Sequence, residues 1–116
     1  MPSIKPKDNC GQVFGIEGLT LGATSAAIRK KDRLDLVVLL LKETAAVSGV
    51  FTQNNFCAAP VQICRQRLSQ GNSINAMVIN TGVANAGTGA DGIEDAKNIC
   101  NELAKLLKVD PDSILP

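Results

Sequence analysis

The stretch LDLVVLLL, residues 34–41, is a nearly continuous aliphatic run, and it decides the fold. Its length argues against a helix, and such a run is typical of a strand that is buried on both faces. The polar turn KKDR precedes it at residues 30–33, and KET follows it at residues 42–44. We therefore expect one buried strand here, bounded by short turns.

Two more strands are predicted around this run, after a turn or strand edge at FGIEG, residues 14–18. Residues 19–29 carry small and β-branched side chains, and Gly22 and Ala23 would admit the close approach of another backbone. Residues 45–53 form the third strand, with Gly49 as a bulge or packing point. Because the connections are short and polar, the three strands indicate an antiparallel meander.

A helix and a fourth strand follow. Pro60 suits the first turn of the helix, and Gly71-Asn72 suits its end. The apolar side of this helix is predicted to comprise Val61, Cys64 and Leu68. Its solvated side is predicted to comprise Arg65, Arg67 and Gln70. Residues 74–80 form the next strand, with Ala76, Val78 and Asn80 on one face.

The last predicted helix spans residues 92–108, with Asp91 as its N-cap and Glu94 completing a capping box. Asp110-Pro111 ends it. Its apolar stripe is predicted to comprise Ile93, Ala96, Cys100, Leu103 and Leu107, widened by Ile99 and Leu106. The resulting order, β-β-β-α-β-α, predicts a mixed α/β fold with an α+β-like order, in a single domain of residues 1–116.

The composition excludes several classes of function. The chain has no His, so these residues cannot form a Ser-His-Asp triad, a Cys-His pair or a His-ligated metal site. The 12 Lys and Arg nearly balance the 11 Asp and Glu, and aromatic residues make up only 3%, which argues against a nucleic-acid partner. The longest aliphatic run is far too short to cross a membrane. We expect no metal, no nucleic acid and no membrane.

The four cysteines are Cys10, Cys57, Cys64 and Cys100, and none forms a C-x-x-C pair. Polar residues follow Met1, so we expect no signal peptide, and reduced thiols in a cytoplasmic protein. The residues SILP, 113–116, begin a new segment. This predicts an incomplete N-terminal domain, whether a truncation, a proteolytic product or a partly ordered subunit. The alternative is a short protein with a frayed tail.

Two stretches carry a specific resemblance: GVFTQNNFCAAPV, residues 49–61, and NTGVANAGTG, residues 80–89. Both are similar to signature stretches of the ornithine acetyltransferase (glutamate N-acetyltransferase) family, in the same order and at similar separation. The similarity extends over residues 13–116. The chain departs from the family at Val83, where many members carry Asn. A valine side chain cannot form a hydrogen bond, so no polar contact with substrate is expected there.

The resemblance implies an α/β sandwich and a precursor that cuts itself at an Ala-Thr bond. The new N-terminal Thr then takes acetyl from N2-acetylornithine and passes it to glutamate, in arginine biosynthesis. Some members also accept acetyl-CoA as acetyl donor, and we expect no cofactor. This chain resembles the front of the small subunit, which pairs with the large subunit from the same precursor, two of each. The catalytic Thr is then in the downstream chain, and these residues alone should be inactive.

The missing His fits this chemistry, because the α-amino group of an N-terminal Thr can serve as its own base. That amine has an ordinary pKa of about 7.7 to 8.0. In the family, a Thr-Gly pair shortly after the point matching Pro116 supplies the oxyanion donors. Such donors are worth about 3 kcal/mol each.

Within this chain, the loop at residues 81–92 is the best candidate for contact with substrate. It follows a strand and leads into a helix N-terminus, where amide donors favour carboxylates. The residues implied are Asn80, Thr81, Gly82 and Asn85. The plainer alternative is a structural turn in which Asn fixes the backbone. A phosphate site at residues 87–92 is disfavoured because the Lys of a P-loop is missing.

Other polar segments have plainer readings. TQNN, residues 52–55, could line a cleft, but a role in capping the helix at Pro60 is favoured. The basic cluster at residues 29–31 is interpreted as a solvated turn. Two other functions stay open for the chain: a related self-processing hydrolase or aminopeptidase, and a non-catalytic binding fragment. With only two clear helices for cover, the isolated chain is expected to be unstable.

Overall fold

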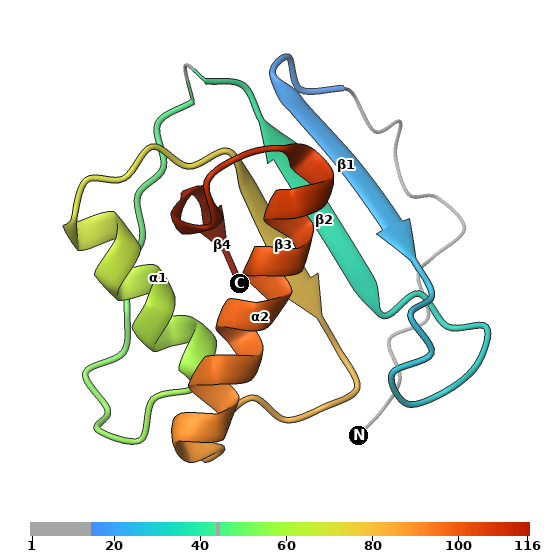
Figure 1. The fold of residues 1–116 in the computed structure, drawn as a ribbon, viewed down its shortest axis with the longest axis vertical. Coiled ribbons are helices and arrows are strands. Elements are labelled where there is room, and N and C mark those ends of the chain that lie inside the picture. The colour runs from blue at the N-terminus through green and yellow to red at the C-terminus, as the bar shows by residue number, and fades with distance from the viewer. Residues whose placement is uncertain (1–14, 44) are drawn as a thin grey trace.

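The computed structural model describes residues 15–43 and 45–116, so the interpretations of Cys10, Phe14 and Thr44 lie outside the described residues. Its strands are β1 (Leu19–Thr24), β2 (Leu36–Leu41), β3 (Ala76–Asn80) and β4 (Ile114–Leu115). Its helices are α1 (Ala59–Ser69), α2 (Gly89–Leu107) and a short 3₁₀ helix (Pro111–Ser113). Figure 1 shows the two α-helices packed on one side of the sheet. The predicted mixed α/β class is confirmed.

The four strands form one sheet in the order β1-β2-β3-β4. β2 pairs antiparallel with β1 on one side and with β3 on the other. β4 pairs parallel with β3. The aliphatic run at residues 34–41 is therefore an interior strand, as its pattern predicts.

The predicted third strand at residues 45–53 is wrong, because none of these residues joins the sheet. β2 has two edges, and β1 and β3 occupy both of them. The segment instead passes α1, where a Cβ added to Gly49 would lie 3.0 Å from the Phe51 ring and 3.3 Å from Leu68. Gly49 is thus a packing point but not a bulge. The observed order is β-β-α-β-α-β, and β4 is the strand that the sequence did not reveal.

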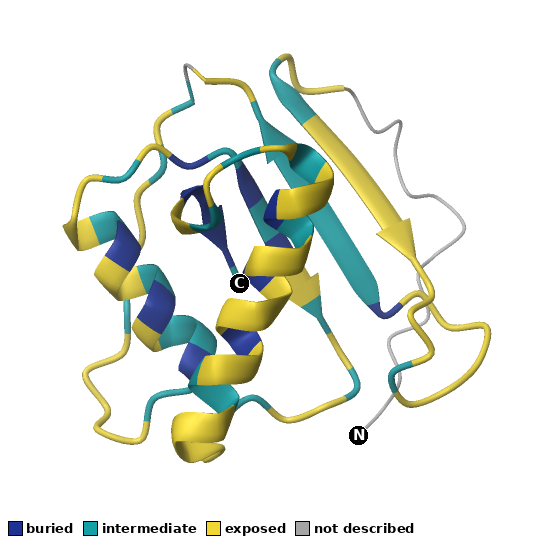
Figure 2. Cartoon of the chain, viewed as in Figure 1, coloured by how far each residue is buried: buried dark blue, intermediate teal, exposed yellow. Residues whose placement is uncertain are grey.

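β1 is shorter than predicted and ends at Thr24. It lies at the edge of the sheet and is largely exposed (Figure 2). A Cβ added to Gly22 would meet no described atom within 4 Å, so the close approach predicted for this glycine is wrong.

α1 begins and ends as the sequence predicts. Pro60 lies in its first turn. At its end the Asn72 amide donates to the Arg67 carbonyl and the Gly71 amide to the Leu68 carbonyl, a Schellman motif with Gly71 at φ 72°.

The predicted cap and solvated face of α1 need correction. Its N-cap is Ala58, which has no capping side chain. The TQNN segment forms its own turns, in which Thr52 accepts from the Asn54 amide and Asn54 from the Phe56 amide. The helix buries Ala59, Ile63 and Arg67, while the predicted apolar residues Val61, Cys64 and Leu68 are half-buried. α1 packs against both α2 and β4, so its buried stripe is rotated from the predicted one.

α2 begins three residues earlier than predicted. Its N-cap is Thr88, without a capping side-chain hydrogen bond, and Asp91 lies inside the first turn. The predicted capping box is therefore wrong. The buried residues of the helix are Ala96, Cys100 and Ala104. Ile99 and Leu106 do not widen the buried stripe, since they are 40% and 80% exposed.

The main core lies between α2 and one face of the sheet. Its buried members are Ala76, Val78, Cys100, Ala104 and Ile114, with Leu36, Val38 and Leu40 packed against them. Figure 2 shows the buried bands of both helices turned inward. The opposite face of the sheet carries Leu39 between its partners Leu21 and Met77. Within the described residues the helices cover only one of the two faces that the sequence predicted to be buried.

Candidate functional site

The candidate site lies where β3 and β4 end. Parallel strands present their carboxyl ends at the same edge of a sheet, and ligands of α/β proteins commonly bind there. β3 ends at Asn80 and continues into the loop 81–88, while β4 leads into Pro116. Asn80 and Pro116 line the same small cavity of about 80 Å³. Residues 36 positions apart in the chain thus meet at one point.

The four residues predicted to touch substrate divide into two pairs. The Asn85 side-chain amide donates to the Asn80 side-chain oxygen at 3.3 Å, and both residues line the cavity. Thr81 and Gly82 lie against the β1–β2 hairpin instead. The Thr81 amide donates to the Asp35 carbonyl at 2.9 Å, and a Cβ on Gly82 would lie 3.2 Å from Cβ of Arg29. The structure therefore places Asn80 and Asn85 at the cavity and Thr81 and Gly82 beside it.

The two sequence stretches at residues 49–61 and 80–89 come together in space. The Ala59 amide donates to the Asn85 carbonyl at 3.3 Å. Gly87 has φ 72°, which favours glycine, and a Cβ added there would lie 2.7 Å from the Phe56 ring, so a larger residue would displace that ring. The start of α1 therefore supports the loop that carries Asn85.

The first turn of α2 closes the cavity from the helix side. Thr88, Gly92, Asp95 and Ala96 are among the residues that line it. A Cβ on Gly92 would lie 1.7 Å from the Thr88 hydroxyl oxygen, so glycine is required there for the Thr88 side chain to keep its place. Val83, where the family resemblance is broken, also lines the cavity and offers an apolar surface.

A larger apolar groove of about 680 Å³ adjoins this cavity. It shares six lining residues with the small cavity, namely Val78, Asn80, Val83, Asn85, Asp95 and Ile99. One wall comes from the hairpin residues Ala26 and Ile28, and the facing wall from α2, including the exposed Leu106. An amide-bearing end and an apolar groove suit a small amphiphilic ligand.

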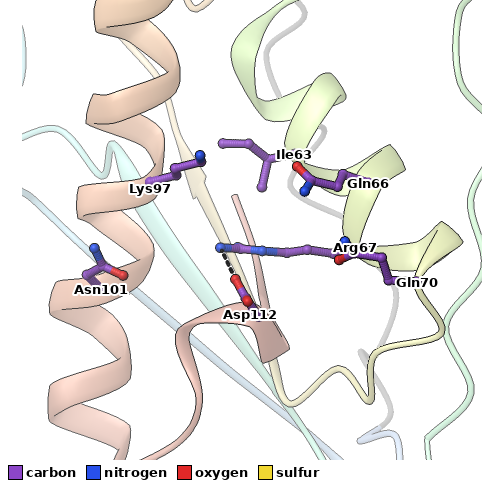
Figure 3. A pocket seen from close by; sticks show the side chains of 7 residues that line it. All are labelled: Ile63, Gln66, Arg67, Gln70, Lys97, Asn101 and Asp112. Carbon is purple, nitrogen blue, oxygen red and sulfur yellow. Dashed lines mark hydrogen bonds and ion pairs between the residues drawn. The ribbon is translucent and has the colours of Figure 1, made fainter.

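A separate polar cleft of about 270 Å³ lies between α1 and α2. Figure 3 shows Arg67 reaching from α1 toward Asp112, with Lys97 extending from α2 on the other side. Arg67 is 5% exposed, so the prediction of a solvated Arg67 is wrong. Its guanidinium donates to the Ile114 carbonyl and pairs with the Asp112 carboxylate at 3.1 Å. Arg65, in contrast, is exposed as predicted.

The described cysteines Cys57, Cys64 and Cys100 are unpaired. Cys64 donates its thiol hydrogen to the Pro116 carbonyl at 3.3 Å. Burial raises the pKa of the Cys64 thiol; nearby Cys100 adds to the increase and Arg67 opposes it. The thiol is therefore held in its neutral form beside the end of β4.

Sequence reasoning missed two residues that organise this region, Asp35 and Arg67. Asp35 is the single charged residue inside the aliphatic run, and it is 4% exposed. A charge in such a run signals a buried carboxylate that needs donors. Arg67 lies four residues after Ile63 and eight after Ala59, which is the spacing of one helix face.

Within the described residues neither α-helix has the length and hydrophobicity needed to cross a bilayer. The family model described as "ArgJ family" matches residues 20–116. A curated relative, the arginine biosynthesis bifunctional protein ArgJ of Colwellia psychrerythraea, is 42% identical over 126 aligned positions. That alignment covers 100% of this chain but 30% of the relative, so the chain spans less than a third of its length.

Two solved structures share the fold. The ornithine acetyltransferase of Mycobacterium tuberculosis, solved in complex with ornithine, gives a TM-score of 0.79 at 30% identity, covering 85% of this chain and 54% of that one. The arginine biosynthesis bifunctional protein ArgJ of Bacillus halodurans gives 0.77 at 25% identity, covering 85% and 51%. The sequence match and the shared fold agree over nearly the whole chain, and the chain belongs to the ArgJ family.

Proposed function

We propose that this chain forms the front of the small subunit of an enzyme that transfers acetyl from N2-acetylornithine to glutamate. The observation that carries the proposal is the meeting of the two signature stretches at the ends of β3 and β4. Family membership and the named relatives support the reaction and its place in arginine biosynthesis. The nucleophile is supplied by downstream polypeptide, which with this chain makes up what we call the assembled enzyme.

The proposed chemistry runs through an acetyl-threonine intermediate. The α-amino group of an N-terminal Thr takes the proton of its own hydroxyl, and the hydroxyl oxygen attacks the acetyl carbonyl carbon. The bond to the ornithine nitrogen breaks, and that nitrogen leaves with the proton. The amine of glutamate then attacks the acetyl ester, forms N-acetylglutamate and restores the Thr hydroxyl. Two successive transfers through one covalent intermediate predict ping-pong kinetics.

In this scheme the described residues bind and orient substrate. Asn85 uses one amide hydrogen on Asn80 and keeps a second donor and an oxygen acceptor for substrate amide or carboxylate groups. Thr81 and Gly82 join the proposed substrate-binding loop by fixing its backbone against the hairpin. The oxyanion donors would follow Pro116, which already lies at the cavity.

The partner in this proposal is the large subunit from the same precursor, in an assembly of two small and two large chains in the cytoplasm. The aliphatic sheet face that the helices leave open, with Leu39 at its centre, suits cover by the remaining polypeptide. Acetyl-CoA is a second proposed acetyl donor, and no other cofactor is needed for these steps.

The test is an assay of the assembled enzyme with acetylornithine and glutamate. We expect N-acetylglutamate to form and the acetyl-enzyme to carry its label on an N-terminal Thr peptide. Consumption of acetylornithine with only acetate formed would instead support the hydrolase alternative. Asn85→Ala should lower kcat/KM by about 10 to 100-fold through lost substrate positioning. The matched variant Asn101→Ala, exposed on α2 and outside both signature stretches, should leave kcat/KM within about twofold.

A further inference from the structure

The buried carboxylate of Asp35 lies beside the candidate site. Asp35 is not one of the proposed substrate-binding residues. Asp35 immediately precedes β2 and is 4% exposed. No ion pair among the described residues involves it. A buried negative charge needs compensating donors, so the question is what its oxygens contact.

Both oxygens of Asp35 accept backbone hydrogen bonds from the turn that follows β1. Oδ1 accepts from the Ala26 amide at 2.6 Å, and Oδ2 accepts from the Ile28 amide at 2.8 Å. Ala27, between them, has φ 52°. A left-handed residue can turn the amides on either side of it toward one anion, and amide–carboxylate hydrogen bonds are the stronger class. The carboxylate therefore fixes the shape of the turn at residues 26–28.

The backbone of Asp35 contacts the loop that follows β3. Its carbonyl accepts from the Thr81 amide at 2.9 Å, directly after β3 ends. The two loops also touch, because a Cβ on Gly82 would lie 3.2 Å from Cβ of Arg29 and 3.6 Å from Cγ2 of Ile28. One residue thus joins the hairpin turn to the loop that carries Asn85.

The turn held in this way forms a wall of the apolar groove. Ala26 and Ile28 line the groove together with Asn80, Val83 and Asn85. Their positions depend on the two amides that bind Asp35, because these amides belong to the same two residues. Moving this turn would widen the groove without removing any group from the cavity end.

We propose that Asp35 is a positioning residue of the substrate site: its carboxylate holds the turn 26–28 as a wall of the groove and its carbonyl holds Thr81. The inference rests on the proposed function for its kinetic consequence. It predicts that loss of the carboxylate weakens substrate binding more than it slows acetyl transfer, because the reacting groups stay in place. It also predicts that the two loops loosen together.

The test compares Asp35→Asn with Gly18→Ala in the assembled enzyme. Asn keeps the shape of Asp but places an amide hydrogen against one of the two backbone donors. Gly18 has φ 86°, and an added Cβ would lie 3.3 Å from Lys42 Cδ. Alanine at this position should therefore strain the opposite end of the same hairpin. We expect both variants to lower the urea midpoint. Asp35→Asn alone should raise KM for acetylornithine by about tenfold or more, with kcat within about threefold.

Two further measurements keep the proposal open to refutation. Ile28→Ala keeps the hydrogen bonds between Asp35 and the turn 26–28 but removes most of the Ile28 side chain from the groove wall. It should therefore raise KM for acetylornithine, even if Asp35→Asn fails to fold. Hydrogen exchange, which needs no substrate, should rise in residues 24–30 and 81–85 together in Asp35→Asn and not in Gly18→Ala. Unchanged KM in Ile28→Ala, or equal effects of Asp35→Asn and Gly18→Ala, would overturn the proposal. If the wild-type enzyme transfers no acetyl group, the proposed function is refuted. Hydrogen exchange would then still test whether the Asp35 carboxylate holds the turn 26–28.

Discussion

The guanidinium of Arg67 donates a hydrogen bond to the backbone carbonyl of Ile114, 47 residues later in the chain. Its other contacts are the sulfur of Cys100 and the carboxylate of Asp112. One side chain on α1 therefore holds α2, the 3₁₀ helix and β4. Because β4 ends at the candidate site, Arg67 fixes the path of the chain toward that site.

Replacing Arg67 with Met should destabilise the assembled enzyme by about 2 to 4 kcal/mol. The substitution removes the guanidinium donor from the buried Ile114 carbonyl and leaves it only the weak Cys100 thiol donor at 3.9 Å. Urea unfolding measures the effect. Arg65→Met removes the same charge from an exposed position, where the guanidinium lies 5.8 Å from the Phe51 ring centre, and should cost about 1 kcal/mol or less. Equal losses in the two variants would show that burial of Arg67 is unimportant.

Gly82→Ala should be more costly than Gly71→Ala. Both glycines have positive φ, 105° and 72° respectively, and alanine at such a position costs more than about 1 kcal/mol. Only at Gly82 would the new methyl group also meet another segment, at 3.2 Å from Arg29. We expect Gly82→Ala to lower the urea midpoint further and to raise KM for acetylornithine, while Gly71→Ala changes stability alone. A normal KM in Gly82→Ala would separate this loop from substrate binding.

Stability should fall at alkaline pH in part through Cys64. Burial raises the pKa of this thiol in the folded chain, so folding favours the neutral form. The stabilisation is complete below the unfolded thiol pKa of about 8.5 and is lost as pH rises through the folded pKa. Cys64→Ser, which cannot titrate in this range, should flatten the decline in urea midpoint above that pH. An identical pH profile in the variant would contradict the assignment.

The isolated chain should unfold with a low or non-cooperative thermal transition. The helices cover one face of the sheet, while Leu21 is 62% and Ile79 51% exposed on the other. Circular dichroism during heating measures the transition, and adding the proposed partner polypeptide should raise and sharpen it. A sharp transition at high temperature in the chain alone would show that the open face needs no cover.

The sequence pattern within one segment was enough to predict the strands and helices that depend on that segment alone. The aliphatic run gave β2, Pro60 and Gly71 marked the ends of α1, and the apolar spacing placed most of α2. The alternation in residues 76–80 correctly placed Ala76 and Val78 on one face of the strand, and the structure shows that this face is the buried one. The two signature stretches predicted the family, which the comparisons confirm.

The local sequence pattern could not predict which strands pair with each other in the sheet. Residues 45–53 have strand-like composition, but the edge of β2 that they would need is taken by β3, from much later in the chain. β4 has only two residues, too few for any periodicity to appear. Segments far apart in the chain compete to pair with the same strand edge. A short stretch of sequence therefore cannot show which segment will pair there.

The sequence by itself determined the mixed α/β class, the interior strand, both helices and the family, because these depend on residue type and spacing along one segment. Only the tertiary structure decided that Arg67 and Asp35 are buried and that Asn80, Asn85 and Pro116 share a cavity. A charged side chain is buried only where distant donors or acceptors satisfy it, and those partners exist only once the chain has folded.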